Sequence, residues 1–133
     1  MSEAQTVKAI RVHAYGGPDS LKLDEIPIGT PGPGEVLIRQ RAIGVNYADI
    51  HTRNGRYPLP ELPSVIGGEA AGEIEAVGDA VSHLKTGDRV AYSSGGHALP
   101  RGSYAEARIL SADRLILLPD EIADETAAAM ITK

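Results

Sequence analysis

Short runs of alternating hydrophobic and polar residues extend along this chain, and none is long enough for an extended helix. Residues 7–12 and 21–26 are two such runs, and turn-forming residues at 15–19 lie between them. A turn cluster in this position excludes a continuous helix. The pattern therefore predicts that the chain opens with a β-hairpin.

Two later runs each predict a strand with one buried face. Residues 35–42 place Val36, Ile38 and Ala42 on one side and arginines on the other. Residues 70–78 also repeat with a period of two, and Glu73 and Glu75 share one side. Since successive side chains of a strand point to opposite faces, we expect the glutamates to face solvent.

Residues 47–54 predict a short helix between these strands. Asn46 is a plausible N-cap, and Gly55 follows as a helix stop. The stretch 56–63 contains three prolines, which cannot donate to a strand ladder, so we expect a stiff irregular loop.

Three further strands are predicted at 89–92, 104–110 and 115–118, which brings the total to about seven. Phe and Trp are absent, so the core must consist of Val, Ile, Leu and Ala. Short strands joined by tight turns are typical of an antiparallel barrel or sandwich, and the predicted class is mainly β.

The C-terminal residues turn helical, with Asp124 as a candidate N-cap and an alanine-rich run after it. The run is too short for its apolar face to find a partner. We therefore expect one domain at 1–123 and, at 124–133, the start of a helix that continues in a longer chain, with a natural frayed end as the alternative.

The charge balance argues against nucleic acid and membrane partners. The 133 residues contain 13 Lys and Arg against 18 Asp and Glu, a formal charge of −5. Such a chain has no net basic surface for phosphates or anionic lipids. Without cysteine, a secretion signal or a long apolar run, the sequence predicts a cytoplasmic protein.

Asn46 and Asp49 form the first candidate site. At a spacing of three they share one face of the predicted helix, where an amide beside a carboxylate can hold sugar hydroxyls or a carboxamide. The alternative is that Asn46 only caps the helix and Asp49 only complements its dipole. Spacing alone leaves both interpretations open.

Tyr57 is a second candidate, because a phenol on a proline-rich loop can donate a proton or a hydrogen bond to a carbonyl compound. A packing role is equally compatible with its position. Glu69 lies in a glycine-rich stretch where a carboxylate needs a partner, and we expect an ion pair with an arginine.

Metal ligands are sparse. The four histidines are dispersed, and no thiolate exists, so the spacing predicts no metal site. His51 is the one histidine with a possible role, as a proton relay near Asp49.

Five motifs in order resemble the zinc-free quinone oxidoreductases of the medium-chain dehydrogenase/reductase superfamily. They are Tyr15-Gly16-Gly17-Pro18, Pro31-Gly32-Pro33-Gly34-Glu35, Gly44-Val45-Asn46-Tyr47-Ala48-Asp49, Gly55-Arg56-Tyr57-Pro58 and Gly87-Asp88-Arg89-Val90. The resemblance spans nearly the whole chain. It implies a GroES-like, partly open β-barrel with short helices, which is the catalytic domain of a two-domain reductase whose Rossmann domain lies outside this sequence.

The resemblance also implies a reaction: NADPH-dependent reduction of a quinone or enone by hydride transfer, in a full-length protein that is a homodimer. The zinc-dependent branch of the superfamily has Cys where this chain has Asn46 and His where it has Gly68. The resemblance further implies that Asn46, Tyr47, Asp49, His51 and Lys133 bind the cofactor. It assigns Tyr57 and Asn46 to catalysis.

Two alternatives remain at this stage. An enoyl-thioester reductase would use the same domain on acyl carriers. A non-enzymatic GroES-like binding or structural module would use no cofactor, and co-chaperonins of that kind form rings. In either reductase, this chain alone is expected to be inactive.

Overall fold

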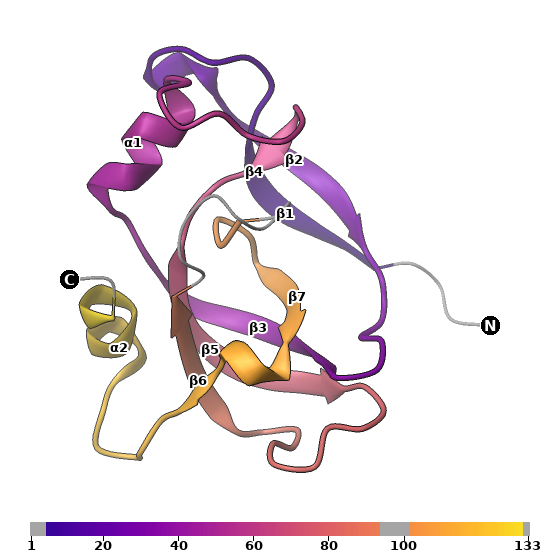
Figure 1. Ribbon diagram of the computed structural model, residues 1–133. Coiled ribbons are helices and arrows are strands. Elements are labelled where there is room, and N and C mark those ends of the chain that lie inside the picture. Colours follow the sequence, from indigo (N-terminus) through magenta and orange to yellow (C-terminus); the bar gives the residue numbers. More distant parts are fainter. Residues whose placement is uncertain (1–4, 94–101, 132–133) are drawn as a thin grey trace.

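The computed structural model describes residues 5–93 and 102–131, which form two antiparallel sheets flanked by short helices (Figure 1). The strands are β1 (Gln5–Val12), β2 (Leu21–Ile28), β3 (Glu35–Gly44), β4 (Ser64–Val65), β5 (Glu69–Val77), β6 (Arg89–Ser93), β7 (Ala107–Ser111) and β8 (Ile116–Leu117). The helices are η1 (Pro18–Ser20), α1 (Tyr47–Arg53), η2 (Ala112–Arg114) and α2 (Asp124–Met130). The predicted mainly β, antiparallel architecture is confirmed.

The opening hairpin is confirmed in full. β1 and β2 pair antiparallel from Gln5 opposite Ile28 to Val12 opposite Leu21, and the turn between them contains η1. The two-residue strand β4 adds to the other side of β1 and gives a three-stranded sheet in the order β2-β1-β4. β4 begins only after the proline-rich stretch, which is irregular as expected.

The second sheet has five strands in the order β7-β3-β5-β6-β8. β3 and β5 are its central pair, with register shifts between Leu37 and Ile38 and between Gln40 and Ala42. Such bulges bend a strand and change which side chains face inward. Consequently the simple alternation expected for residues 35–42 is incomplete, because Leu37 is buried as well as Val36 and Ile38.

The solvent-exposed face predicted for residues 70–78 is confirmed. Arg39 pairs with Glu75, with Nη2 and Oε2 3.2 Å apart, and both side chains are exposed. Glu73 faces Arg41 in the same way at 3.6 Å. On the inner side, Val36, Ile38, Ile74 and Val90 are fully buried around Tyr92. The core is therefore aliphatic, as expected from the absence of Phe and Trp, with one tyrosine as its largest member.

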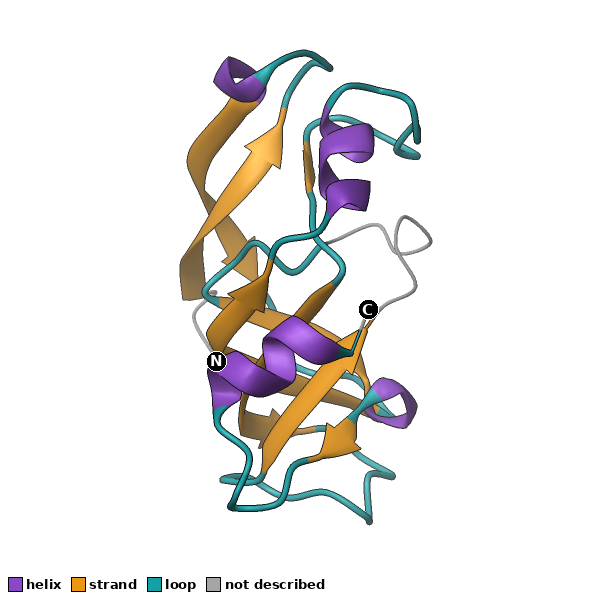
Figure 2. Cartoon of the chain, turned by 90° about the vertical axis from the view of Figure 1, so that its left-hand side faces the viewer, coloured by secondary structure: helices purple, strands orange, loops and turns teal. Residues whose placement is uncertain are grey.

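Two expectations about the C-terminal helix were wrong. Its N-cap is Ala123, and Asp124 is instead the first helical residue, where its carboxylate accepts a hydrogen bond from Arg89 at 3.1 Å. The helix also has a partner, because Ala127 and Ala128 are buried against Ala71 and Ala91 of the sheet. Alanine allows this close approach, and Figure 2 shows α2 lying across the sheet.

The segment before β7 links the two sheets. Tyr104 accepts a backbone hydrogen bond from Ile10, and Glu106 donates one to Lys8, both in β1. Glu106 also accepts a backbone hydrogen bond from Gln40 in β3. Residues 104–106 thus lie between both sheets, although the sequence pattern had predicted them as part of a longer strand.

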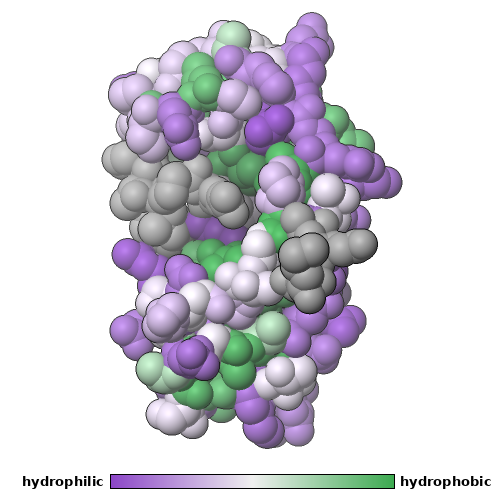
Figure 3. All heavy atoms as spheres, turned by 90° about the vertical axis from the view of Figure 1, so that its right-hand side faces the viewer, coloured by the Kyte–Doolittle hydropathy of each residue, from purple (hydrophilic) through white to green (hydrophobic). Residues whose placement is uncertain are grey.

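The outer surface is mixed in polarity. On the face shown in Figure 3, hydrophilic residues form most of the outline, and hydrophobic residues gather in smaller areas toward the middle. Neither helix in the part of the chain that the structure describes has the length and hydrophobicity needed to cross a bilayer.

Candidate functional site

The first turn of α1 is the centre of the candidate site. Asn46 precedes the helix in an extended conformation, and its backbone N–H donates to Asp49 Oδ2 at 3.0 Å. This bond is half of a capping box, in which a side chain in the first turn satisfies the amide before the helix. The predicted helix and N-cap are confirmed, and Asp49 has the structural role that we considered for it.

The Asn46 side chain makes a second contact. Its amide donates to the carboxylate of Glu69, which is fully buried at the start of β5. A carboxylate without a bound proton only accepts hydrogen bonds, so Asn46 must turn its NH₂ group toward Glu69. Asn46 therefore does more than cap the helix. The expected arginine partner of Glu69 stays a prediction.

Gly44 makes this arrangement possible. A side chain there would collide with the Glu69 side chain and with the carbonyl oxygen of Ala128 in α2. The end of β3, the start of β5 and α2 therefore meet at a backbone position that tolerates no Cβ atom.

Tyr104 is a member of the site that the sequence did not reveal. Its hydroxyl donates to Asp49 Oδ2 at 2.7 Å, across 55 residues of sequence. Burial raises the pKa of this phenol first of all, and the hydrogen bond to Asp49 and the repulsion by its negative charge raise that pKa further. Tyr104 is therefore a protonated donor at every ordinary working pH. The scarcity of aromatic residues was the only sequence signal that could have drawn attention to it.

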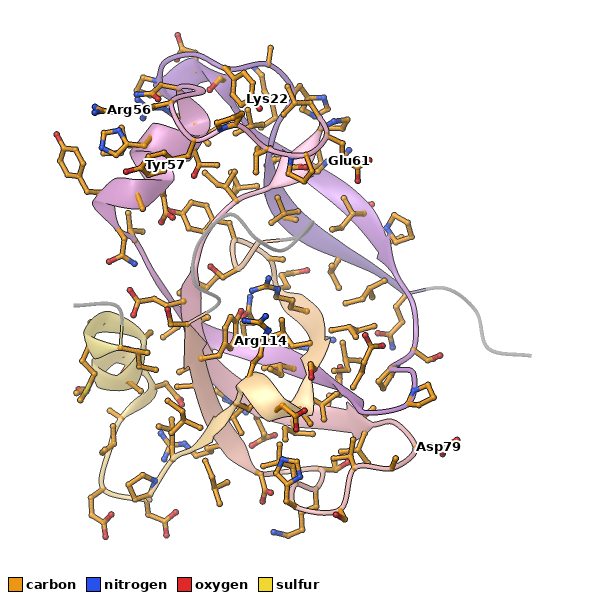
Figure 4. All side chains as sticks on the ribbon, in the orientation of Figure 1. Lys22, Arg56, Tyr57, Glu61, Asp79 and Arg114 are labelled. Atoms are coloured by element: carbon orange, nitrogen blue, oxygen red, sulfur yellow. The ribbon has the colours of Figure 1, made fainter. Side chains whose placement is uncertain are left out.

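Three rings form a separate group on the outer side of α1. The His51 ring lies 5.3 Å from that of Tyr47 and 5.1 Å from that of Tyr57, measured between centroids. Tyr47 is 75% exposed and Tyr57 39% exposed. Figure 4, in which Tyr57 is labelled, shows it beside α1. His51 thus packs between two phenols, and a proton relay through Asp49 stays a prediction.

The loop that carries Tyr57 is held on two sides. The backbone N–H of Tyr57 donates to the carbonyl of His51 at 3.1 Å. Further along, the N–H of Leu59 donates to the Tyr15 hydroxyl at 2.8 Å. The phenol of Tyr57 is therefore presented by a backbone tied to both α1 and the first turn of the chain.

The structure thus divides the predicted site residues into two groups. Asn46 and Asp49 belong to the buried network, whereas Tyr47, His51 and Tyr57 form the exposed ring group on the same helix and its loop. Lys133 lies outside the described residues.

The donor set of the buried network does not fit zinc. Zinc in proteins is held by thiolate, imidazole and carboxylate ligands, four in a structural site and three with a water molecule in a catalytic site. Here Glu69 is engaged by an amide, and residues 5–93 and 102–131 contain no group of three or more His, Cys, Asp or Glu residues placed to hold a metal ion. The residues at the N-terminus of α1 instead offer an amide, carboxylates and a phenol, which form hydrogen bonds with one another.

A nicotinamide nucleotide fits these residues better. Its ribose hydroxyls and carboxamide both donate and accept hydrogen bonds, and the exposed group offers two phenols and an imidazole. These rings also give flat, partly exposed surfaces of the kind that line small-molecule sites. Asn46, Tyr47 and His51 are the residues that would hold such a group.

Comparison with known proteins agrees with the fold. Residues 32–120 match the family described as the alcohol dehydrogenase GroES-like domain. A quinone oxidoreductase of Pseudomonas aeruginosa is 48% identical over 126 residues, which are 95% of this chain and 38% of that protein.

Two solved structures show the same relationship. The quinone oxidoreductase of Pseudomonas syringae pv. Tomato DC3000 superposes with a TM-score of 0.84 at 43% identity, over 92% of this chain and 36% of the other. The Escherichia coli quinone oxidoreductase complexed with NADPH gives a TM-score of 0.82 at 36% identity, over the same shares. The chain spans less than two-fifths of the length of these relatives.

Proposed function

Because this chain belongs to the alcohol dehydrogenase GroES-like domain family, and its relatives include quinone oxidoreductases of the medium-chain dehydrogenase/reductase superfamily, we propose that it is the catalytic domain of an NADPH-dependent reductase. The substrates are quinones or α,β-unsaturated carbonyl compounds. In this proposal residues 1–123 form the catalytic domain, and residues 124–133 begin the connection to a nucleotide-binding domain.

The hydrogen bond between Asn46 and Glu69 is the observation that carries this proposal. In the zinc-dependent branch of the superfamily, a cysteine ligand of the metal stands at the position of Asn46. Here an amide, held by a buried carboxylate, replaces it. That substitution supports a reaction that proceeds by positioning and hydrogen bonding, without a Lewis acid.

NADPH, when bound, supplies the hydride. In the proposal, Asn46 and Tyr47 bind the nucleotide, and Asp49 maintains the first turn of α1. Tyr57 donates a hydrogen bond or a proton to the substrate from its loop, and its exposure is consistent with access to a ligand. His51, whose ring contacts both phenols, also binds the nucleotide in this proposal.

The test is an oxidation assay of NADPH with the full-length protein and three substrate panels: quinones, small enones and enoyl thioesters. We expect turnover with quinones or enones, and none with this 133-residue segment alone. Turnover confined to enoyl thioesters would favour the acyl-carrier alternative. Failure to bind or oxidise NADPH with any panel would contradict the proposal.

Two further measurements address metal dependence and assembly. Dialysis against a chelator should leave the turnover rate unchanged, and a loss that zinc restores would contradict the zinc-independent mechanism. A sizing column should give a dimer of the full-length protein. A ring of seven copies would support the co-chaperonin alternative instead.

A further inference from the structure

We propose that Tyr104 is a positioning residue for nucleotide binding, which acts by holding Asp49 and through it the first turn of α1. This inference rests on the proposed function, because it assumes that α1 contacts the nucleotide. It concerns a residue outside α1, from the segment that joins the two sheets. The contact is the hydrogen bond of 2.7 Å from the Tyr104 hydroxyl to Asp49 Oδ2.

Asp49 Oδ2 accepts two hydrogen bonds. One donor is the backbone N–H of Asn46 at 3.0 Å, and the other is the Tyr104 hydroxyl. The oxygen therefore connects the residue before the helix to a side chain of the barrel. Since Asp49 is 7% exposed, water is a poor substitute for either donor. Loss of the phenol would leave a buried carboxylate with one partner fewer.

Tyr104 is itself held firmly. Its backbone N–H donates to the carbonyl of Ile66 at 2.9 Å. On both sides of it, the Gln40 side-chain amide donates to the carbonyls of Ser103 at 2.6 Å and Ala105 at 2.8 Å. The ring also lies against the backbone of Gly67, where an added Cβ would come within 2.8 Å of the ring atom Cε1. These contacts therefore hold the Tyr104 side chain in the orientation in which its hydroxyl reaches Asp49.

The result is support for α1 from two sides. Tyr104 holds Asp49, and Glu69 holds the side chain of Asn46. The helix has only seven residues, so little of its order can come from its own hydrogen bonds. Catalytic and binding groups need their supporting contacts to be fixed in this way. Tyr104 supplies such a contact without touching the ligand itself.

The experiment compares Tyr104→Phe with a matched control, Ile74→Val, in the full-length protein. Ile74 is fully buried in the core of the larger sheet, in a cluster that contains no residue of α1. The loss of one buried methyl group destabilises a protein about as much as the loss of one hydrogen bond. Two readouts are measured for each variant: amide hydrogen exchange of the first turn of α1 without ligand, and the Kd for NADPH by fluorescence titration.

We expect Tyr104→Phe to speed exchange at residues 46–50 and to raise the Kd for NADPH about tenfold, whereas Ile74→Val changes neither. Equal effects of both variants would reduce Tyr104 to a general stability role and overturn the inference. Unchanged exchange in Tyr104→Phe would overturn it as well. Faster exchange in a protein that does not bind NADPH would instead contradict the proposed function.

A double-mutant cycle gives an independent check. If Tyr104 acts through Asp49, Tyr104→Phe should have little further effect on the Kd once Asp49→Asn has weakened that acceptor. Fully additive effects of the two substitutions would show that Tyr104 acts by another route and would contradict the inference.

Discussion

The side-chain amide of Asn46 donates a hydrogen bond to the fully buried carboxylate of Glu69, which joins the start of α1 to the start of β5. Burial makes this hydrogen bond important for stability. If the donor is removed, the protein loses the hydrogen bond and also leaves the desolvation cost of the buried carboxylate uncompensated. The pair therefore orients the Asn46 amide, and it connects the candidate nucleotide site to the centre of the larger sheet.

Two substitutions of Asn46 test this relationship. Asn46→Ala should raise the Kd for NADPH about tenfold, because the ordered amide is lost. Asn46→Asp should be more harmful than Asn46→Ala, because it replaces the hydrogen-bond donor by a second acceptor beside a buried carboxylate. Fluorescence titration of both variants with NADPH measures the difference. A Kd for Asn46→Ala equal to that of the wild type would remove Asn46 from the nucleotide site.

Tyr57 is tested by removing its hydroxyl. Tyr57→Phe keeps the ring contact with His51, so any effect reports on the phenol itself. If Tyr57 delivers a proton to the substrate, kcat should fall about 10²-fold or more, with little change in the Kd for NADPH. Steady-state kinetics with a quinone substrate give this comparison. An unchanged kcat would assign Tyr57 to packing.

Stability in alkali should depend on Tyr104. Its pKa is raised in the folded protein, so the unfolded chain loses this proton first, as the pH rises above about 10. The stabilisation that Tyr104 contributes is therefore complete below that pH and is lost as the pH rises further. The difference in free energy of unfolding between wild type and Tyr104→Phe should be constant from about pH 8 to about pH 10 and should shrink above it. Denaturant unfolding at each pH measures it. Other titrating groups are common to both proteins, and a constant difference would contradict the assignment.

Gly44 should tolerate no side chain. Gly44→Ala would force a methyl group against Glu69 and the Ala128 carbonyl, and overpacking of this kind costs about 1–3 kcal/mol. Gly29→Ala is a suitable control, because nothing lies within 4 Å of an added Cβ there. Thermal unfolding of both variants gives the comparison, and equal stability would show that α2 moves away from the sheet at little cost.

The elements with a local pattern could be predicted from the sequence. The hairpin of β1 and β2, the helix after Asn46 and the exposed face of Glu73 and Glu75 all depend on periodicity and on turn or capping residues nearby. The burial of Leu37 could not be predicted, since it depends on bulges in β3 and on packing by the three-stranded sheet.

In the candidate site, too, only the residues with a local sequence signature could be predicted. Asn46 and Asp49 stand out because they cap a helix, and Tyr57 because it lies in a proline-rich loop. The partner of Asp49 does not stand out. Tyr104 is 55 residues away and lies in a stretch that reads as an ordinary strand. The N-cap predicted for α2 was wrong for a similar reason, because the Asp124 side chain accepts a hydrogen bond from Arg89, a residue of β6 that lies far away in the sequence.

The mainly β class, the aliphatic core, the short helix with its capping residues and the family resemblance could all be inferred from the amino-acid sequence. Each of these depends on composition or on residues close together in the chain. Three contacts are visible only in the folded chain: the Asn46 amide binds Glu69, Tyr104 holds Asp49, and α2 packs on the sheet. Those contacts join residues far apart in sequence, and their partners are chosen by strand register and burial, which no local pattern encodes.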